Sequence, residues 1–266
     1  MCRNVLGAVL LALILSGRPQ VAGQESADDT ATPSELPPGV ALTRLASQEM
    51  GPLPEAPAWV GLARFTFAAG AQGSAEVAPG PTLFIVETGS ITFELGDGQA
   101  TVGATPAGGN SVLGPGERFF IAANGSYTAR NGGGSEATAL RVVIYPAAPL
   151  IQPAAGVSYQ LLTGGIVEAL SSERTVVAVS RVSLAAGADV STRAGGADGP
   201  ILVFVESGLV SLELPGAQAV LSPGGTALIQ SNNESTAHNA DGRPALVLVL
   251  AISTADPDDA VGTPVP

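Results

Sequence analysis

The chain contains no lysine, since all eleven of its basic residues are arginine. This absence excludes a Walker A phosphate loop, a pyridoxal Schiff base and any lysine nucleophile. Cysteine and histidine are almost as scarce, with Cys2 and His238 as the only examples. A zinc site built from Cys and His, or a metal site with several histidines, therefore cannot be assembled from this chain.

Charge and aromatic residues are also sparse. Charged residues make up 13% of the chain and carry a net charge of −12, while aromatic residues make up 4%. An acidic surface repels phosphate backbones and anionic lipids, so we expect neither nucleic acid nor a membrane surface as a partner. The few aromatic residues give little support for a sugar-stacking surface. With 45% hydrophobic residues, the 266-residue chain is long enough for one or two domains with real cores.

Residues 1–23 have the three parts of a secretory signal peptide. Arg3 precedes an apolar run over residues 5–15, which is too short to span a bilayer comfortably. Small residues at Val21-Ala22-Gly23 suit signal peptidase. We expect a secreted or extracytoplasmic protein that begins at Gln24, with no membrane contact beyond this signal, and an uncleaved N-terminal anchor is the alternative.

Two polar segments flank the rest of the chain. Residues 24–41 are acidic and rich in proline, and we expect them to form a flexible linker. Residues 254–266 resemble them and are expected to be a disordered tail. The acidic residues of this tail lack the spacing and the closing glutamate of an EF-hand calcium loop.

Two pairs of matching segments reveal an internal repeat. LFIVETGSITFEL at 83–95 and LVFVESGLVSLEL at 202–214 share six of thirteen positions. LGPGERFFIAANGSYTARN at 113–131 and LSPGGTALIQSNNESTAHN at 221–239 share eight of nineteen without a gap. We therefore divide the chain into one copy at 42–148, a connector at 149–156 and a second copy at 157–253.

Each copy has the pattern of short β-strands separated by Gly, Pro and Asn, and no segment after residue 23 shows a helical period. The strands that we expect lie at 60–68, 82–87, 91–95, 118–122, 127–130, 138–145, 175–184, 201–205, 210–214, 227–230 and 246–252. Many short strands at close spacing favour a sandwich or a closed barrel, which hides strand edges. The sequence therefore predicts an all-β protein of two similar units.

At these residues the chain resembles the cupin superfamily in its two-domain, bicupin form. The resemblance covers about 42–253. The first cupin signature matches in overall length from Gly70 to Gly89, and the second matches from Gly116 to Asn131 and from Gly224 to Asn239. The resemblance implies two tandem jelly-roll barrels, or double-stranded β-helices, each with a cavity. It also marks six fold-setting turn residues, which are Gly89, Gly116, Asn131, Gly208, Gly224 and Asn239.

The family often holds a metal through three histidines and one glutamate, but this chain has other residues at those positions. In the first copy they are Glu76, Ala78, Thr82 and Tyr127. In the second copy Ser235 replaces the last histidine. The first signature there is two residues too long, so one register puts Arg193 at a ligand position and the other does not. We expect no metal and no cofactor, and treat these six residues as a candidate pocket.

Several of these residues have a structural as well as a functional interpretation. Glu76 and Tyr127 could form a polar site with a carboxylate acceptor and a phenol donor, or lie on the rim and in the packing of the barrel. His238 lies three positions after Ser235, so strand alternation places it on the outer face. Glu87 and Glu206 precede turn glycines, which suggests a turn role or an outward strand position.

Three functions fit the sequence. The first is an exported bicupin-like protein that serves as a small-ligand-binding or structural module. The second is a metal-free or oxygen-ligated cupin enzyme, of isomerase, epimerase or oxidase type, using Glu76 and Tyr127. The third is an envelope interaction protein, whose copies could pair as a homodimer. The first is favoured because the turn glycines are kept while the metal ligands are lost.

Overall fold

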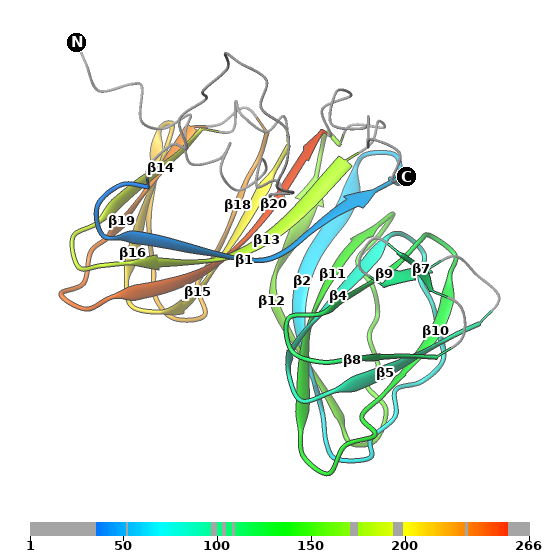
Figure 1. The fold of residues 1–266 in the computed structure, drawn as a ribbon. Coiled ribbons are helices and arrows are strands. Elements are labelled where there is room, and N and C mark those ends of the chain that lie inside the picture. Colours follow the sequence, from blue (N-terminus) through cyan, green and yellow to red (C-terminus); the bar gives the residue numbers. More distant parts are fainter. Residues whose placement is uncertain are drawn as a thin grey trace, which may run out of the picture.

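The computed structural model describes residues 36–51, 53–96, 100–102, 105–107, 110–170, 175–193, 199–231 and 234–254. The expected signal peptide, most of the expected linker and the tail from 255 lie outside these ranges. Every regular element in the described part is a β-strand, and the strands gather into two lobes (Figure 1). The predicted fold class, all-β with two tandem cupin-like jelly-roll barrels, is confirmed by this arrangement.

The first barrel consists of a seven-stranded sheet facing a four-stranded sheet. In spatial order the larger sheet contains β12 (Val157–Val167), β2 (Ala58–Phe67), β11 (Ala137–Tyr145), β4 (Thr82–Thr88), β9 (Arg118–Ile121), β6 (Ala100–Val102) and β7 (Thr105–Ala107). The smaller sheet contains β3 (Glu76–Val77), β10 (Ser126–Arg130), β5 (Ile91–Leu95) and β8 (Asn110–Leu113).

The second barrel repeats this plan with a five-stranded and a four-stranded sheet. The larger sheet contains β1 (Val40–Met50), β13 (Thr175–Leu184), β20 (Ala245–Thr254), β15 (Ile201–Ser207) and β18 (Thr226–Ile229). The smaller sheet contains β14 (Asp189–Arg193), β19 (Glu234–Asn239), β16 (Val210–Leu214) and β17 (Ala217–Leu221).

The two barrels exchange their first strands. Strand β1, which precedes the first copy, pairs antiparallel with β13 of the second barrel, and β12, which begins the second copy, pairs with β2 of the first. Both strands carry a bulge at the same place, between Arg44 and Ala46 in β1 and between Leu161 and Thr163 in β12. In Figure 1 the blue β1 accordingly runs along the lobe of the yellow and orange strands. Residues 42–50 therefore belong to the second barrel in space.

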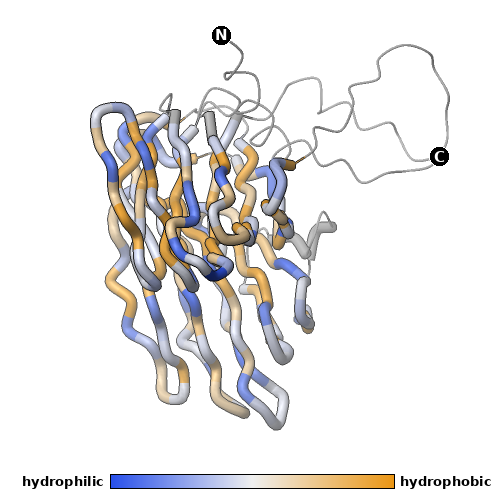
Figure 2. The backbone as a smooth tube through the Cα atoms, turned by 90° about the vertical axis from the view of Figure 1, so that its left-hand side faces the viewer, coloured by the Kyte–Doolittle hydropathy of each residue, from blue (hydrophilic) through white to orange (hydrophobic). Residues whose placement is uncertain are grey.

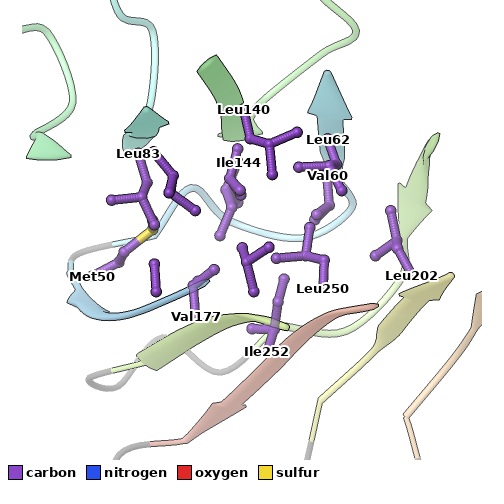
Figure 3. Close-up of a cluster of buried hydrophobic side chains, with 14 of the residues drawn as sticks. Met50, Val60, Leu62, Leu83, Leu140, Ile144, Val177, Leu202, Leu250 and Ile252 are labelled. Carbon is purple, nitrogen blue, oxygen red and sulfur yellow. The ribbon is translucent and has the colours of Figure 1, made fainter. Parts of the chain in front are cut away.

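Buried side chains form three clusters, one inside each barrel and one between the barrels. Strand alternation separates them: along β11, Ala139 faces the first barrel's interior, while Leu140 and Ile144 face the second barrel. Figure 3 shows the cluster between the barrels, where Ile144 meets side chains such as Leu250. Each such fully buried leucine or isoleucine stabilises the fold by about 2 kcal/mol. Figure 2 shows apolar segments along the strands, with hydrophilic segments interspersed among them.

One glycine in each barrel, at equivalent turns, allows two neighbouring strands to approach closely. Gly89 and Gly208 have φ angles of 70° and 81°. A Cβ atom at either position would lie 2.7 Å from a side chain on the next strand, Ala137 or Ala245. The left-handed backbone and the close approach both require glycine there.

Candidate functional site

The interior of the first barrel is aromatic. Phe65, Phe84, Phe93 and Phe119 pack in a chain of ring contacts, with centroids 4.5 to 6.4 Å apart. The exchanged strand β12 adds Tyr159, whose ring lies 5.2 Å from that of Phe65. Such rings present negative faces to a cation that enters the barrel.

That cation is Arg141, on the inward face of β11. Its side chain is only 3% exposed, and its guanidinium lies 5.5 Å from the ring centres of both Phe65 and Phe84. It also lies 5.9 Å from the ring of Tyr127. A buried charge needs a partner, because its transfer from water is costly. The partner is Glu76, whose Oε2 lies 3.0 Å from Arg141 Nη2.

Glu76 and Tyr127 meet across two paired strands. Their Cα atoms are register partners in β3 and β10, so both side chains lie on one face. The Tyr127 hydroxyl donates a hydrogen bond of 2.8 Å to Glu76 Oε2, the same oxygen that Arg141 contacts. The structure thus brings together the two residues on which the sequence-based polar site depends, with Arg141 as a third member.

Tyr145 links this group to Thr82. The Arg141 guanidinium donates to the Tyr145 hydroxyl at 2.7 Å, and this hydroxyl also bonds the Thr82 hydroxyl at 2.9 Å. Thr82 is fully buried and Ala78 lies in the barrel core, so neither offers a free donor or acceptor to a ligand. Within the candidate pocket, Ala78 and Thr82 thus have packing and supporting positions.

Burial and charge fix the protonation of this group. Burial raises the pKa of the Tyr127 phenol well above its ordinary value, despite the opposing charge of Arg141. Burial alone would lower the pKa of Arg141, but the two tyrosines and Glu76 outweigh it and raise that pKa. Near neutral pH the site therefore holds a neutral phenol and a permanent guanidinium cation.

Two spaces reach this group. An interior space of about 20 Å³, between Arg141, Tyr127 and the aromatic rings, has room for a single water molecule. Outside it an open groove of about 480 Å³ is lined by Glu76, Arg141 and Tyr145 together with residues that include Val77 and Leu150. The connector between the repeats forms part of both walls. The groove has the volume of an ordinary small-molecule site.

The interior of the second barrel is aliphatic. Strand register places Val249 where the first barrel has Arg141, and Val203 where it has Phe84. A space of about 40 Å³ there is lined by aliphatic side chains and by Ser235, which is buried. Among the described residues, the interior of the first barrel therefore contains the polar cluster and the interior of the second does not.

The strand register corrects one candidate in the second barrel. The pair equivalent to Glu76 and Tyr127 is Thr192 and Ser235, while the Cα of Arg193 pairs with Glu234. Arg193 is therefore one position past the expected place, because Thr192 lies five positions after the turn glycine Gly187, whereas Glu76 lies six positions after Gly70. His238 is 43% exposed and bonds Asp189 across the strands, which agrees with its expected outer position.

The residues of the first barrel do not fit the family's metal. Ala78 has no donor atom, and the Thr82 and Tyr127 hydroxyls already bond within the protein. The guanidinium of Arg141 lies against the one carboxylate, where it would repel a metal cation. Within the described ranges, no group of three or more His, Cys, Asp or Glu residues could hold a metal ion. Arg141 instead supplies a fixed positive charge at the centre of the barrel.

Glu87 and Glu206 belong to a separate four-residue cluster where the barrels meet. Arg64 bonds Glu87 at 2.6 Å and Glu206 at 2.9 Å. Arg181 bonds Glu206 at 2.7 Å and Glu87 at 3.0 Å. These residues lie on β2, β4, β13 and β15, and each arginine contacts a glutamate from either barrel. Their recurrence in the two copies thus comes from an ionic clamp between barrels.

Arg141 and Tyr145 did not enter the candidate pocket on sequence grounds. The signature that locates cupin ligands ends at Asn131, before β11 begins. A usable signal was present, since Arg141 is the single charge in the strand ATALRVVIY and the repeat alignment continues to Val249. A buried strand with one unmatched arginine points to a site of its own.

Comparisons with known proteins give a likeness of fold. No protein-family model matches the chain, and no curated protein matches it. AerE from Microcystis aeruginosa is 11% identical, with a TM-score of 0.47 over 79% of this chain and 98% of that chain. Oxalate decarboxylase from Bacillus subtilis is 10% identical, with a TM-score of 0.48 over 80% and 78%. YhaK from Escherichia coli is 14% identical, with a TM-score of 0.49 over 80% and 94%. At these identities the likeness says nothing of a ligand or a reaction.

Proposed function

We propose that this bicupin-like chain is a small-ligand-binding protein in which the first barrel binds and the second serves as a scaffold. The observation that carries the proposal is Arg141, a guanidinium that is almost fully buried yet forms part of an open groove of about 480 Å³. Buried charges are costly and are concentrated at sites that use them.

The asymmetry between the repeats supports this division of labour. Both copies keep the same turns and the same buried asparagines, Asn131 and Asn239, so both need them to fold. The charge at the barrel centre is present in one copy and replaced by Val249 in the other. A feature that the fold does not require in both barrels is more readily explained by a ligand than by stability.

The proposal is tested by obstructing the groove. Ser74 lines it, and a Ser74→Trp variant would fill much of the space. Val220, 65% exposed on the second barrel's edge strand, provides the matched control Val220→Trp. A fragment screen followed by NMR should find ligands that shift the resonances of groove residues. These ligands should bind Val220→Trp as they bind the parent, and should not bind Ser74→Trp. Ligands whose binding is unchanged by both substitutions would show that the binding site lies elsewhere.

A metal-free enzyme is the second candidate. The favouring observation is that Glu76 is 37% exposed toward the groove and holds a hydrogen bond from Tyr127. A carboxylate in that position could accept a proton from a bound substrate, with Tyr127 returning one. An isomerase or epimerase activity that survives both Glu76→Gln and Tyr127→Phe would exclude this role.

Export is proposed from the N-terminal pattern alone. Arg3, the apolar run at 5–15 and the small residues before Gln24 support it. In the described residues, no helix is both long and apolar enough to cross a bilayer. Expression with the native N-terminus, fractionation and N-terminal sequencing would test the proposal. A chain starting at Gln24 outside the cytoplasm is expected, and an intact N-terminus in the cytoplasm would contradict it.

A further inference from the structure

We propose that the ligand of the first barrel is a small carboxylic acid with an apolar body, whose carboxylate takes the place of Glu76 on Arg141. This inference rests on the proposed binding function and specifies the chemical class of the ligand. It follows from three features of the site: an arginine with unused donor capacity, a carboxylate that can leave it, and apolar side chains in the lining of the same groove.

Arg141 has donor capacity that the protein does not use. Its Nε is buried and has no hydrogen-bond partner among the described residues, while Nη2 contacts both Glu76 and Tyr145. A guanidinium presents its N–H groups as a planar fork that matches the two oxygens of a carboxylate. The single contact from Glu76 Oε2 leaves that fork incompletely used, so a bidentate carboxylate would be better bound than Glu76 is.

The Glu76 side chain is placed where it can move away from Arg141. This side chain is 37% exposed, whereas that of Arg141 is 3% exposed. It lies on β3, a strand of two residues that pairs with β10 at the edge of its sheet. Rotation of Glu76 into the groove would return its charge to water at little cost. Tyr127, held protonated by burial, would then donate its hydrogen bond to the incoming carboxylate instead.

The groove lining also includes apolar side chains, beside polar ones such as Ser74 and Gln152. Leu150 and Val77 line the groove and are 98% and 63% exposed. Pro79 and Pro149 belong to the same lining. An aliphatic or aromatic body attached to the carboxylate would cover these side chains and remove apolar area from water. The charge and the apolar side chains together therefore favour an amphiphilic acid over an inorganic anion.

A cationic ligand fits the site poorly. It would have to approach Glu76 beside a guanidinium 3.0 Å away, whose charge already neutralises that carboxylate. A neutral ligand would leave the Nε of Arg141 without an acceptor. The substitution Glu76→Gln separates these cases by sign, since it removes a competitor of an acid but a binding partner of a cation.

The test is a calorimetric titration of the purified protein with octanoate. We expect Glu76→Gln to bind octanoate about tenfold more tightly than the parent, because a charged competitor for Arg141 is gone. Glu94, 38% exposed and paired with Arg130 on the same barrel, gives the matched control Glu94→Gln, which should bind as the parent does. The double variant Glu76→Gln/Arg141→Met keeps the site neutral, and it should bind octanoate at least about tenfold more weakly than Glu76→Gln does.

The remaining outcomes separate this inference from the function beneath it. Weaker octanoate binding by Glu76→Gln would overturn the exchange of carboxylates, because Glu76 would then hold the ligand. If octylammonium or octanol binds the groove and octanoate does not, the ligand class is wrong while the binding function stands. If no ligand from the fragment screen or this series shifts groove resonances, both proposals fail. Should the double variant not fold, the comparison of Glu76→Gln with Glu94→Gln still decides.

Discussion

Two asparagines hold equivalent corners of the two barrels together. The Asn131 amide donates to the carbonyls of Phe67, Ala68 and Ser135, and its oxygen accepts from the backbone of Gly133. Asn239 makes the same set of bonds in the second barrel. Both side chains are 1% exposed, so water cannot replace these bonds if the amide is lost.

We expect Asn131→Ala to lower the free energy of unfolding by about 2–4 kcal/mol, because it orphans several buried carbonyls at once. Chemical denaturation followed by circular dichroism would measure it. Asn110→Ala, at an exposed position of β8, is the control and should change stability by less than about 0.5 kcal/mol. Equal effects of the two substitutions would show that the hydrogen-bond set contributes nothing.

The effect of burial on the Tyr127 phenol can be tested by titration. It raises the pKa of its phenol well above the ordinary value, and burial also raises that of Tyr159. We therefore expect absorbance titrations at 295 nm of the parent and of Tyr127→Phe to coincide up to about pH 11. The loss of one tyrosine's amplitude near pH 10 in the variant would show that Tyr127 is solvated, and would remove the neutral donor from the proposed site.

At the scale of elements, the sequence predicts many of the strands but not their partners. The strands missing from the prediction are β1, β3, β6, β7, β8, β12, β14, β17 and β19. Period-2 patterns and turn residues locate strands such as β4, β5 and β16 close to their observed bounds. The strands β1 and β12 escaped because the bulge in each interrupts the alternation of more and less exposed positions. Nothing in a local pattern distinguishes pairing within a copy from pairing between copies. Likewise, spacing rules located Glu76 and Tyr127, while Arg141 enters the site only through the register of β11 with β4.

The strand exchange can be tested with engineered disulfides. In the structure Ala41 is the register partner of Ser183, whereas Ser158, its repeat equivalent, is the partner of Thr66. Opposed residues of antiparallel strands lie within disulfide range. In a Cys2→Ser background, Ala41→Cys/Ser183→Cys should therefore oxidise completely, as seen by mass spectrometry of peptides. Ala41→Cys/Thr66→Cys should not, and efficient oxidation of that pair would mean that β1 stays with the first copy.

At the scale of the whole molecule, the repeats contribute alike to assembly and unlike to chemistry. The ionic clamp of Arg64, Glu87, Arg181 and Glu206 and the apolar cluster between the barrels draw equivalent residues from each copy. With exchanged strands as well, neither barrel keeps its contacts without the other. Within this shared frame, one barrel has the buried charge of Arg141 at its centre and the other has Val249.

The clamp gives the assembly a defined response to acid. Burial alone would raise the pKa of Glu206, but hydrogen bonds from Arg181 and Arg64 outweigh it and hold that pKa below its usual value. A carboxylate with a lowered pKa in the folded state stabilises the protein above its unfolded pKa, near pH 4, and loses this contribution as pH falls through the folded value.

We expect Glu206→Gln to reduce the free energy of unfolding at pH 7 by about 1–3 kcal/mol. The same substitution should flatten the loss of stability below about pH 5, measured by urea unfolding at each pH. Glu94→Gln, on the outer face, should leave the acid limb close to that of the parent. If Glu206→Gln and the parent lose stability in parallel as pH falls, the clamp does not contribute to the acid dependence of unfolding.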